Sequence, residues 1–112
     1  MADQRTRLRV AVHYRLIVRH AGVEGRGQTE NLSERGAMAS IDVDPALCAG
    51  DHIELDIELP GHGTVSVAAS VRWTSTVLPG MTGLEFTQPI SAELLGHIAE
   101  LVTTGVDEAE GF

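Results

Sequence analysis

A two-residue alternation of apolar and polar side chains over residues 52–59 is the clearest pattern in the chain. The apolar members are Ile53, Leu55, Ile57 and Leu59. Because successive side chains of a strand point to opposite faces of a sheet, the pattern predicts a strand with one buried and one solvated face. After a turn at 60–63, the alternation predicts a second strand over 64–74, whose inward side chains are Val65, Val67, Ala69, Val71 and Trp73.

Three shorter stretches predict further strands. Residues 10–20 alternate more loosely, residues 36–41 are mostly apolar, and residues 81–87 carry Leu84 and Phe86. One face of the first stretch holds Val10, Val12, Tyr14 and Leu16. Turns are predicted where glycine or proline gathers, namely at 21–27 with Gly22, Gly25 and Gly27, at Asp44-Pro45, and at Pro79-Gly80.

After residue 90 the pattern changes to helical spacing. Ser91 can cap a helix by accepting a backbone N–H bond, and Gly105 is a suitable stop. The apolar positions between them are Leu94, Leu95, Ile98, Leu101 and Val102, and we expect them to pack on the strands. Five or six short strands followed by one helix indicate an all-β domain, either a small antiparallel barrel or a sandwich, with the helix closing an open side.

The composition is that of one small intracellular domain. A chain of 112 residues fits a single domain, and 43% hydrophobic but only 4% aromatic residues require a mostly aliphatic core. Cys48 is the single cysteine, so an intrachain disulfide is excluded and a reducing compartment is indicated. No secretory signal and no apolar run of about 20 residues is visible. We therefore expect a cytoplasmic protein that does not insert into membranes.

Charge is distributed unevenly along the chain. All eight basic residues are arginines. Seven of them stand in residues 1–35 against four acids, a local charge of +3, and they are Arg5, Arg7, Arg9, Arg15, Arg19, Arg26 and Arg35. The rest of the chain has Arg72 against twelve acids, a charge of −11, which argues against DNA or RNA as a partner. A basic segment on an acidic body fits a small bound anion, although charge alone also allows that the arginines are merely solvated.

Two short motifs could bind such an anion. Arg5-Thr6-Arg7-Leu8-Arg9 precedes the first predicted strand. A guanidinium can grip a phosphate with two hydrogen bonds, stack on a base, or donate to O6 and N7 of guanine. In the second motif, Asn31-Leu32-Ser33-Glu34-Arg35-Gly36, an extended backbone would place Asn31 and Ser33 on one exposed face with Leu32 inward. The alternative is a serine or Asx turn that only starts a strand.

Together, the two motifs resemble the ligand-binding signature of the PilZ family, Arg-x-x-x-Arg followed some 20–30 residues later by Asp/Asn-x-Ser-x-x-Gly. Arg5 and Arg9 match the first element, while the second is matched by Asn31, Ser33 and Gly36. Val71-Arg72-Trp73 and Gly83-Leu84-Glu85-Phe86 are also similar to later family motifs. The family often has adjacent arginines at the start of the first element, whereas here Thr6 separates Arg5 from Arg7.

The resemblance implies a six-stranded antiparallel β-barrel with a C-terminal helix at about 91–104, contained in residues 10–105. It implies cyclic di-GMP as the ligand, no cofactor, and binding by Arg5, Arg9, Asn31, Ser33 and Gly36, with Arg7 and Arg35 as further candidates. Residues 1–9 would be mobile until they clasp the ligand, and 106–112 would form an acidic tail. The domain would then signal to an effector protein, as a monomer or weak homodimer.

Other functions have less support in the sequence. The alternative within the family is a domain that binds no nucleotide and serves as an interaction module in pilus or motility machinery. The histidines show no metal-ligand spacing, so no metal site is predicted; they are His13, His20, His52, His62 and His97. Serine, histidine and aspartate occur without a nucleophile-elbow pattern, so we do not expect an enzyme.

Overall fold

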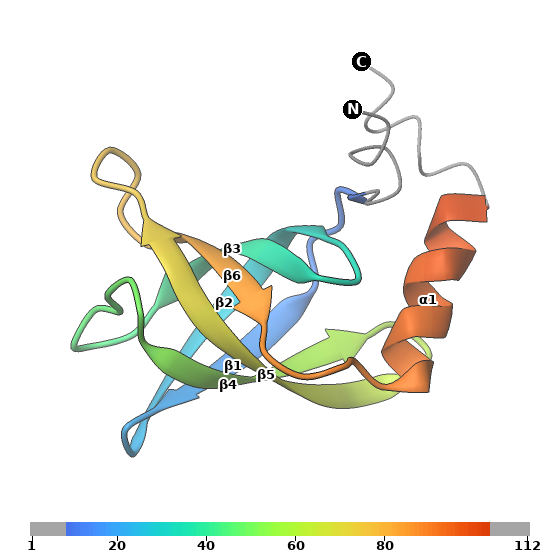
Figure 1. The fold of residues 1–112 in the computed structure, drawn as a ribbon, viewed down its shortest axis with the longest axis horizontal. Helices are drawn as coiled ribbons and strands as arrows, with labels where there is room; N and C mark the ends of the chain where they lie inside the picture. Colours follow the sequence, from blue (N-terminus) through green and yellow to red (C-terminus); the bar gives the residue numbers. More distant parts are fainter. Residues whose placement is uncertain (1–8, 104–112) are drawn as a thin grey trace.

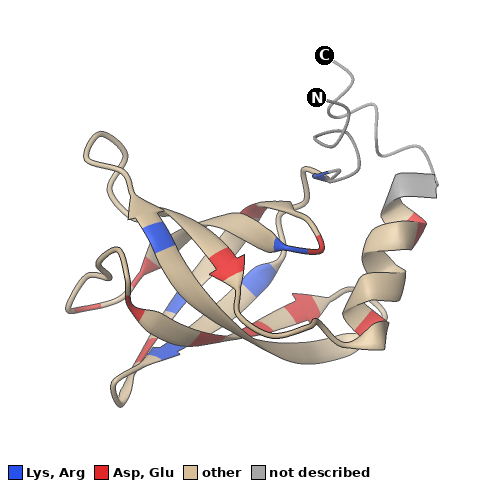
Figure 2. Ribbon diagram, in the orientation of Figure 1, with Lys and Arg blue, Asp and Glu red and all other residues tan. Residues whose placement is uncertain are grey.

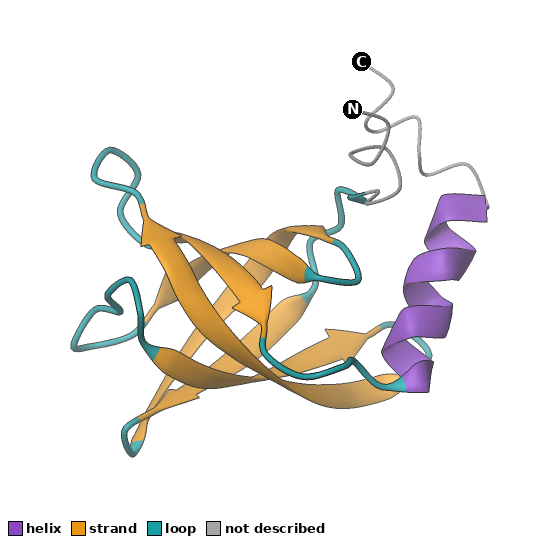
Figure 3. Cartoon of the chain, in the orientation of Figure 1, coloured by secondary structure: helices purple, strands orange, loops and turns teal. Residues whose placement is uncertain are grey.

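The computed structural model describes residues 9–103, which fold into six strands and one helix (Figures 1 and 3). The elements are β1 (Arg15–His20), β2 (Val23–Leu32), β3 (Gly36–Asp42), β4 (His52–Leu59), β5 (Gly63–Thr74), β6 (Met81–Phe86) and α1 (Ala92–Thr103). The strands are antiparallel and form a closed barrel in the order β1-β2-β3-β6-β5-β4, because β1 also pairs with β4. The predicted all-β barrel with a C-terminal helix is confirmed. Residues 1–8, most of the predicted arginine segment, and the predicted tail at 106–112 lie outside the described residues.

The inward faces of the strands form an aliphatic core. On β4, the alternation predicted from the sequence is confirmed, since Ile53, Leu55, Ile57 and Leu59 are all buried. On β5, the inward residues from Val65 to Val71 are buried as predicted. Every buried hydrophobic side chain in residues 9–103 is valine, leucine, isoleucine or alanine, as expected for a chain with so few aromatic residues. Burying this aliphatic surface is the main stabilising contribution to the fold.

The chain before β1 is not the strand that the sequence predicts for residues 10–14. Val10 makes one isolated bridge to Leu32, and the regular ladder begins only at Arg15. The Thr29 hydroxyl takes the place of a ladder here: it accepts a hydrogen bond from the Tyr14 amide (2.9 Å) and donates one to the Val12 carbonyl. The buried Thr29 side chain of β2 thus satisfies the hydrogen bonds of the Val12 carbonyl and the Tyr14 amide. In a regular strand, the backbone of a neighbouring strand would do so.

The glycines at 25 and 27 serve strand packing instead of the turn predicted at 21–27. The turn consists of Ala21 and Gly22, and β2 runs from Val23 through both later glycines. A Cβ atom on Gly27 would lie 2.1 Å from the Ser40 carbonyl oxygen on β3, and one on Gly25 would lie 2.4 Å from the Val43 Cβ. Any side chain at these positions would push the neighbouring strand away.

Gly27→Ala should therefore reduce the free energy of unfolding by about 1–3 kcal/mol, the usual cost of overpacking. Gly96→Ala is the matched control, because a Cβ on this α1 residue has no atom within 4 Å. Alanine favours a helix over glycine, so this control should gain up to about 1 kcal/mol. Urea unfolding of both variants measures the difference. Equal stability of Gly27→Ala and the wild type would contradict the close approach of β2 and β3.

Helix α1 begins at the predicted cap and covers one end of the barrel (Figure 1). The Ser91 hydroxyl accepts a hydrogen bond from the Leu94 amide (3.2 Å). Leu94 and Ile98 are buried in the core, as expected. Leu95 is 43% exposed, so its predicted place in the packed face is wrong. Within residues 9–103, no helix has the length and apolar character needed to cross a membrane.

Candidate functional site

A β-bulge in β2 determines which way Asn31 points. The pairing of β2 with β3 shifts register between Thr29 and Asn31, so Glu30 is an extra residue in the strand. Thr29 and Leu32 are both fully buried although three positions separate them, whereas an unbroken strand would bury every second residue. The bulge therefore turns Asn31 to the outer face, opposite Met38 of β3.

A second bulge has the same effect on Trp73. The pairing of β5 with β6 shifts register between Val71 and Trp73, with Arg72 as the extra residue. Val71 is buried, but Trp73 is 44% exposed, so the predicted inward orientation of Trp73 is wrong. The indole lies against Gly83 of β6, where an added Cβ would be 2.2 Å from the indole Nε1. Glycine at position 83 thus makes room for the tryptophan ring.

These two bulges align four residues on the outside of the barrel. Asn31 pairs with Met38, Met38 with Gly83, and Gly83 with Trp73, across β2, β3, β6 and β5. We call Asn31, Met38, Gly83 and Trp73 the outer row. Three strand spacings separate its ends, about 14 Å between backbones. The outer row therefore has an amide at one end, an aromatic ring at the other, and a thioether side chain between them.

Arg9 joins the two sequence motifs at the amide end of the outer row. Its Nη1 donates a hydrogen bond to the Asn31 Oδ1 over 2.7 Å, although the residues stand 22 positions apart in the sequence. Asn31 is partly exposed, and among the described residues only Arg9 hydrogen bonds to its side chain. Arg5 and Arg7, the other candidates in the first motif, lie outside the described residues.

Ser33 and Gly36 shape the turn between β2 and β3. Ser33 is only 2% exposed, so it does not share the exposed face of Asn31 as predicted. Its hydroxyl accepts hydrogen bonds from the amides of Arg35 and Gly36, each over 3.2 Å. A Cβ on Gly36 would lie 2.1 Å from the Leu84 carbonyl oxygen of β6. The structure therefore contains a serine turn, which the sequence analysis gave as the alternative. Gly36 permits the expected close approach of the backbone.

Arg35 stands in this turn with its side chain exposed. It borders a groove of about 480 Å³ between the turn, the end of β6 and the start of α1, where Phe86 and Leu95 also line the wall. The groove opens on the side of the barrel that carries the second motif. Arg35 is therefore placed to reach a ligand near the turn, as one of the further candidates.

Two of the other described arginines, Arg19 and Arg72, form ion pairs. Figure 2 shows basic positions at both ends of the barrel and not on one face. Arg19 forms an ion pair with Asp56 (2.5 Å), which raises the pKa of Arg19 and lowers the pKa of Asp56. Arg72 pairs with Glu85. No carboxylate within residues 9–103 pairs with Arg9, whose hydrogen bond is to a neutral amide. Among the described residues, the charge of Arg9 is therefore not neutralised by a carboxylate.

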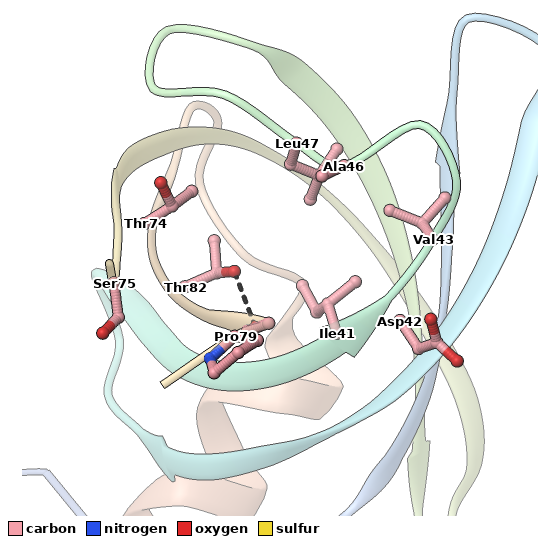
Figure 4. A pocket seen from close by; sticks show the side chains of 10 residues that line it. Ile41, Asp42, Val43, Ala46, Leu47, Thr74, Ser75, Pro79 and Thr82 are labelled. Atoms are coloured by element: carbon pink, nitrogen blue, oxygen red, sulfur yellow. Dashed lines mark hydrogen bonds between the residues drawn. The ribbon is translucent and has the colours of Figure 1, made fainter. Parts of the chain in front are cut away.

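A cavity at the other end of the barrel is a poor candidate for an anion. It has a volume of about 420 Å³, and Figure 4 shows its walls, formed by side chains that include Ile41, Leu47, Thr82 and Asp42. The Thr82 hydroxyl is already bonded to the Gly80 carbonyl (2.9 Å). No arginine lines the cavity, and Asp42 would repel a phosphate. Arg9 and the outer row form the better site.

Comparison with known proteins identifies the family. The model of the PilZ domain matches residues 3–104, nearly the whole chain. The chain belongs to the PilZ domain family. This match confirms the resemblance noted from the sequence motifs. PilZ domains are a family of cyclic di-GMP receptors, and they are binding and adaptor modules rather than enzymes.

Two solved structures show the same fold. The inhibitor of motility MotI/DgrA of Bacillus subtilis is 15% identical, with a TM-score of 0.74 over 94% of this chain and 52% of that one. The PilZ domain of CeSA from a cellulose-synthesizing bacterium is 18% identical, with a TM-score of 0.63 over 86% of this chain and 95% of that one. This PilZ domain therefore spans about half the length of MotI/DgrA. No curated protein matches the chain in sequence.

Trp73 and Met38 are the residues of the candidate site that sequence reasoning missed in this PilZ domain. Strict alternation from Val65 to Val71 carries Trp73 into the core, and only the bulge at Arg72 reverses it. One signal was available: a large ring needs a small neighbour, and the strand that pairs with β5 offers Gly83. Met38 carries no comparable signal, because methionine is common in both cores and surfaces.

Ser33→Ala should lower stability, contrary to the expectation from an exposed serine. The change leaves two amides of a buried turn without their acceptor, so we expect a loss of about 1–3 kcal/mol in the free energy of unfolding. Ser66→Ala is the control: this exposed serine donates to Asp56, and its loss should change stability by less than about 0.5 kcal/mol. Chemical denaturation of both variants tests the difference, and equal stabilities would mean that the hydroxyl does not hold the turn.

Proposed function

We propose that this PilZ domain is a cyclic di-GMP receptor that binds the nucleotide across Arg9 and the outer row. The observation that supports this most directly is the hydrogen bond between Arg9 and Asn31, because it joins the two halves of the ligand-binding signature on one outer surface. Membership of a family of cyclic di-GMP receptors supplies the ligand class.

Arg9 and Asn31 have the chemistry that a guanine nucleotide needs. The guanidinium can bind a phosphate through two parallel hydrogen bonds, and it carries a charge that no described carboxylate neutralises. With its oxygen bound to Arg9, Asn31 still has two amide N–H donors that a ligand could use. Guanine presents two acceptors, O6 and N7, on one edge. Phosphate would therefore bind to Arg9, and a guanine edge would bind to Asn31.

The rest of the outer row suits the flat face of a base. The partly exposed indole of Trp73 lies against Gly83, and Met38 is the partner of Gly83 on the next strand. Bases stack on aromatic side chains with about 1–3 kcal/mol each. Asn31 at one end would read the edge of a base, while the thioether and the indole would support its face. Polar and stacking contacts of this kind together bind a nucleotide more strongly than charge alone.

Binding would also change the surface that a partner protein meets. We propose that Arg5, with Arg7, closes on the bound phosphates and that the resulting surface is recognised by an effector. MotI/DgrA is named as an inhibitor of motility, and a partner in motility machinery is the corresponding proposal here. Slower hydrogen exchange of residues 1–9 on addition of cyclic di-GMP would support this step, and unchanged exchange would contradict it.

Calorimetric titration with cyclic di-GMP tests the proposed binding. Arg9→Ala removes charge-assisted hydrogen bonds, so we expect a loss of about 1.5–3 kcal/mol, roughly 10- to 150-fold in affinity. Arg9→Lys should restore only part of this loss, because an ammonium has the charge without the planar fork.

Arg19→Ala is the control for this series, since Arg19 lies on β1 and is paired with Asp56. It should bind cyclic di-GMP like the wild type. An equal loss in Arg19→Ala and Arg9→Ala would show diffuse attraction to basic residues and would contradict the assigned site. Absence of any heat with the wild type would favour the alternative, a PilZ domain that serves as a protein-interaction module without nucleotide.

Trp73→Leu should weaken cyclic di-GMP by about 5- to 150-fold, the equivalent of one stacked base, whereas Trp73→Phe should lose less. Trp73 is the single tryptophan of the chain, so its fluorescence reports binding in the wild type. Leu78→Ala, which removes another exposed apolar side chain from the β5–β6 loop, serves as control. Unchanged affinity in Trp73→Leu would place the base away from the outer row.

A further inference from the structure

A group of three metal-ligating side chains lies where α1 meets the β4–β5 turn, apart from the outer row. His62 is in the turn, and His97 and Glu100 are on α1. One nitrogen of each histidine and one carboxylate oxygen lie within 4.8 Å of one another. Residues three apart on a helix share a face, so His97 and Glu100 both point toward the turn. The separation of 35 positions between His62 and His97 explains why sequence spacing gave no sign of this group.

His97 is held as metal-binding histidines commonly are. It is 9% exposed, and its Nε2 lies 2.7 Å from the Tyr14 hydroxyl oxygen. Its Nδ1 is buried and has no hydrogen-bond partner among the described residues. Metal-ligating histidines usually bind the metal through one ring nitrogen and use the other for a hydrogen bond that fixes the ring. Tyr14 provides that second contact at Nε2, which leaves Nδ1 as the ring nitrogen without a hydrogen-bond partner among the described residues.

An unpartnered buried nitrogen needs a physical explanation, because it costs free energy that a hydrogen bond or a metal would recover. The His62 ring stands 5.1 Å from the His97 ring, centroid to centroid, nearly perpendicular to it. His62 is exposed in its turn and free to adjust its ring toward a shared ion.

We propose that His62, His97 and Glu100 bind a divalent transition-metal ion of the zinc class. Two imidazoles and one carboxylate are a donor set that Zn²⁺ accepts, with a fourth position left for water. Ligands about 2.1 Å from a tetrahedral Zn²⁺ stand about 3.4 Å from each other. The present separations, up to 4.8 Å, require a closure of roughly 1 Å or more by side chains that are exposed in the case of His62 and Glu100.

The ion would join α1 to the barrel. Buried contacts of the helix include those of Leu94 and Ile98, and a metal shared with the β4–β5 turn would add a bond between the two elements. Because the ion binds only the folded arrangement of these residues, it would stabilise the domain in proportion to its concentration. The site needs neither Arg9 nor the outer row, so it is independent of nucleotide binding.

Titration of the metal-free full chain with Zn²⁺ tests the proposal, with calorimetry for stoichiometry and affinity and thermal unfolding for stabilisation. The wild type should bind one ion at this site and melt at a higher temperature. His62→Ala is the main variant, because an exposed turn residue can change without unfolding the core, and it should weaken Zn²⁺ by more than tenfold. Tyr14→Phe, which removes only the positioning hydroxyl, should weaken it by about 10- to 100-fold.

His52→Ala is the matched control, since it removes an exposed histidine of β4 outside the cluster. It should retain the affinity and the rise in melting temperature. Visible absorption of bound Co²⁺ gives a separate signature, because a four-coordinate site produces an intense band that His62→Ala should abolish. No binding by the wild type, or equal affinity in His62→Ala, would overturn the proposal.

Discussion

Closure of a six-stranded barrel around small aliphatic side chains is the constraint on which the rest of this structure depends. The pairing of β1 with β4 removes the sheet edges, so every strand must hold its register against two neighbours. The close approaches at Gly27 and Gly36 are part of this closure, because a carbonyl of the adjacent strand occupies the space of a side chain. The barrel therefore requires glycine at these positions of β2 and β3.

The bulges in β2 and β5 interrupt the regular pairing of the barrel, and they create the candidate site. A single extra residue reverses the face on which all later side chains of a strand appear. At Glu30 it exchanges an inward Asn31 for an outward one, and at Arg72 it does the same for Trp73. The strands β3 and β6 lie between the two bulged strands. The outer row forms because the two bulges bring Asn31 and Trp73 into the same row of paired residues, together with Met38 and Gly83.

The family signature divides into two physical roles in this chain. Arg9 and Asn31, which are joined by a hydrogen bond, are the residues that we propose to present charge and hydrogen-bonding groups to a ligand. Ser33 and Gly36 instead fix the turn and the spacing of β3 from β6, which holds Asn31 and Arg35 at the surface. At the end covered by α1, Tyr14 and His97 form a polar contact between the N-terminal segment and the helix. Ligand chemistry and barrel geometry thus share one short stretch of sequence.

The sequence by itself determined those features that depend on local patterns. Alternation over His52–Leu59 predicted β4 to the residue, the change of period after residue 90 predicted α1, and Ser91 predicted its first turn. Few aromatic residues predicted an aliphatic core. The order of the arginine and asparagine motifs indicated the PilZ family. Each of these signals lies in a short stretch of sequence, in the order of two short motifs, or in the composition of the whole chain.

Only the tertiary structure decided the features that depend on a neighbouring strand or helix. Alternation assumes an unbroken strand, so it placed Trp73 inside and Ser33 outside. The gathering of glycines assigned Gly25 and Gly27 to a turn, although both lie in β2. A bulge is fixed by the register of the partner strand, and burial of a hydroxyl by the turn around it, neither of which the local pattern contains. The meeting of His62 with His97 likewise follows from where α1 packs on the barrel, because no spacing along the chain records that contact.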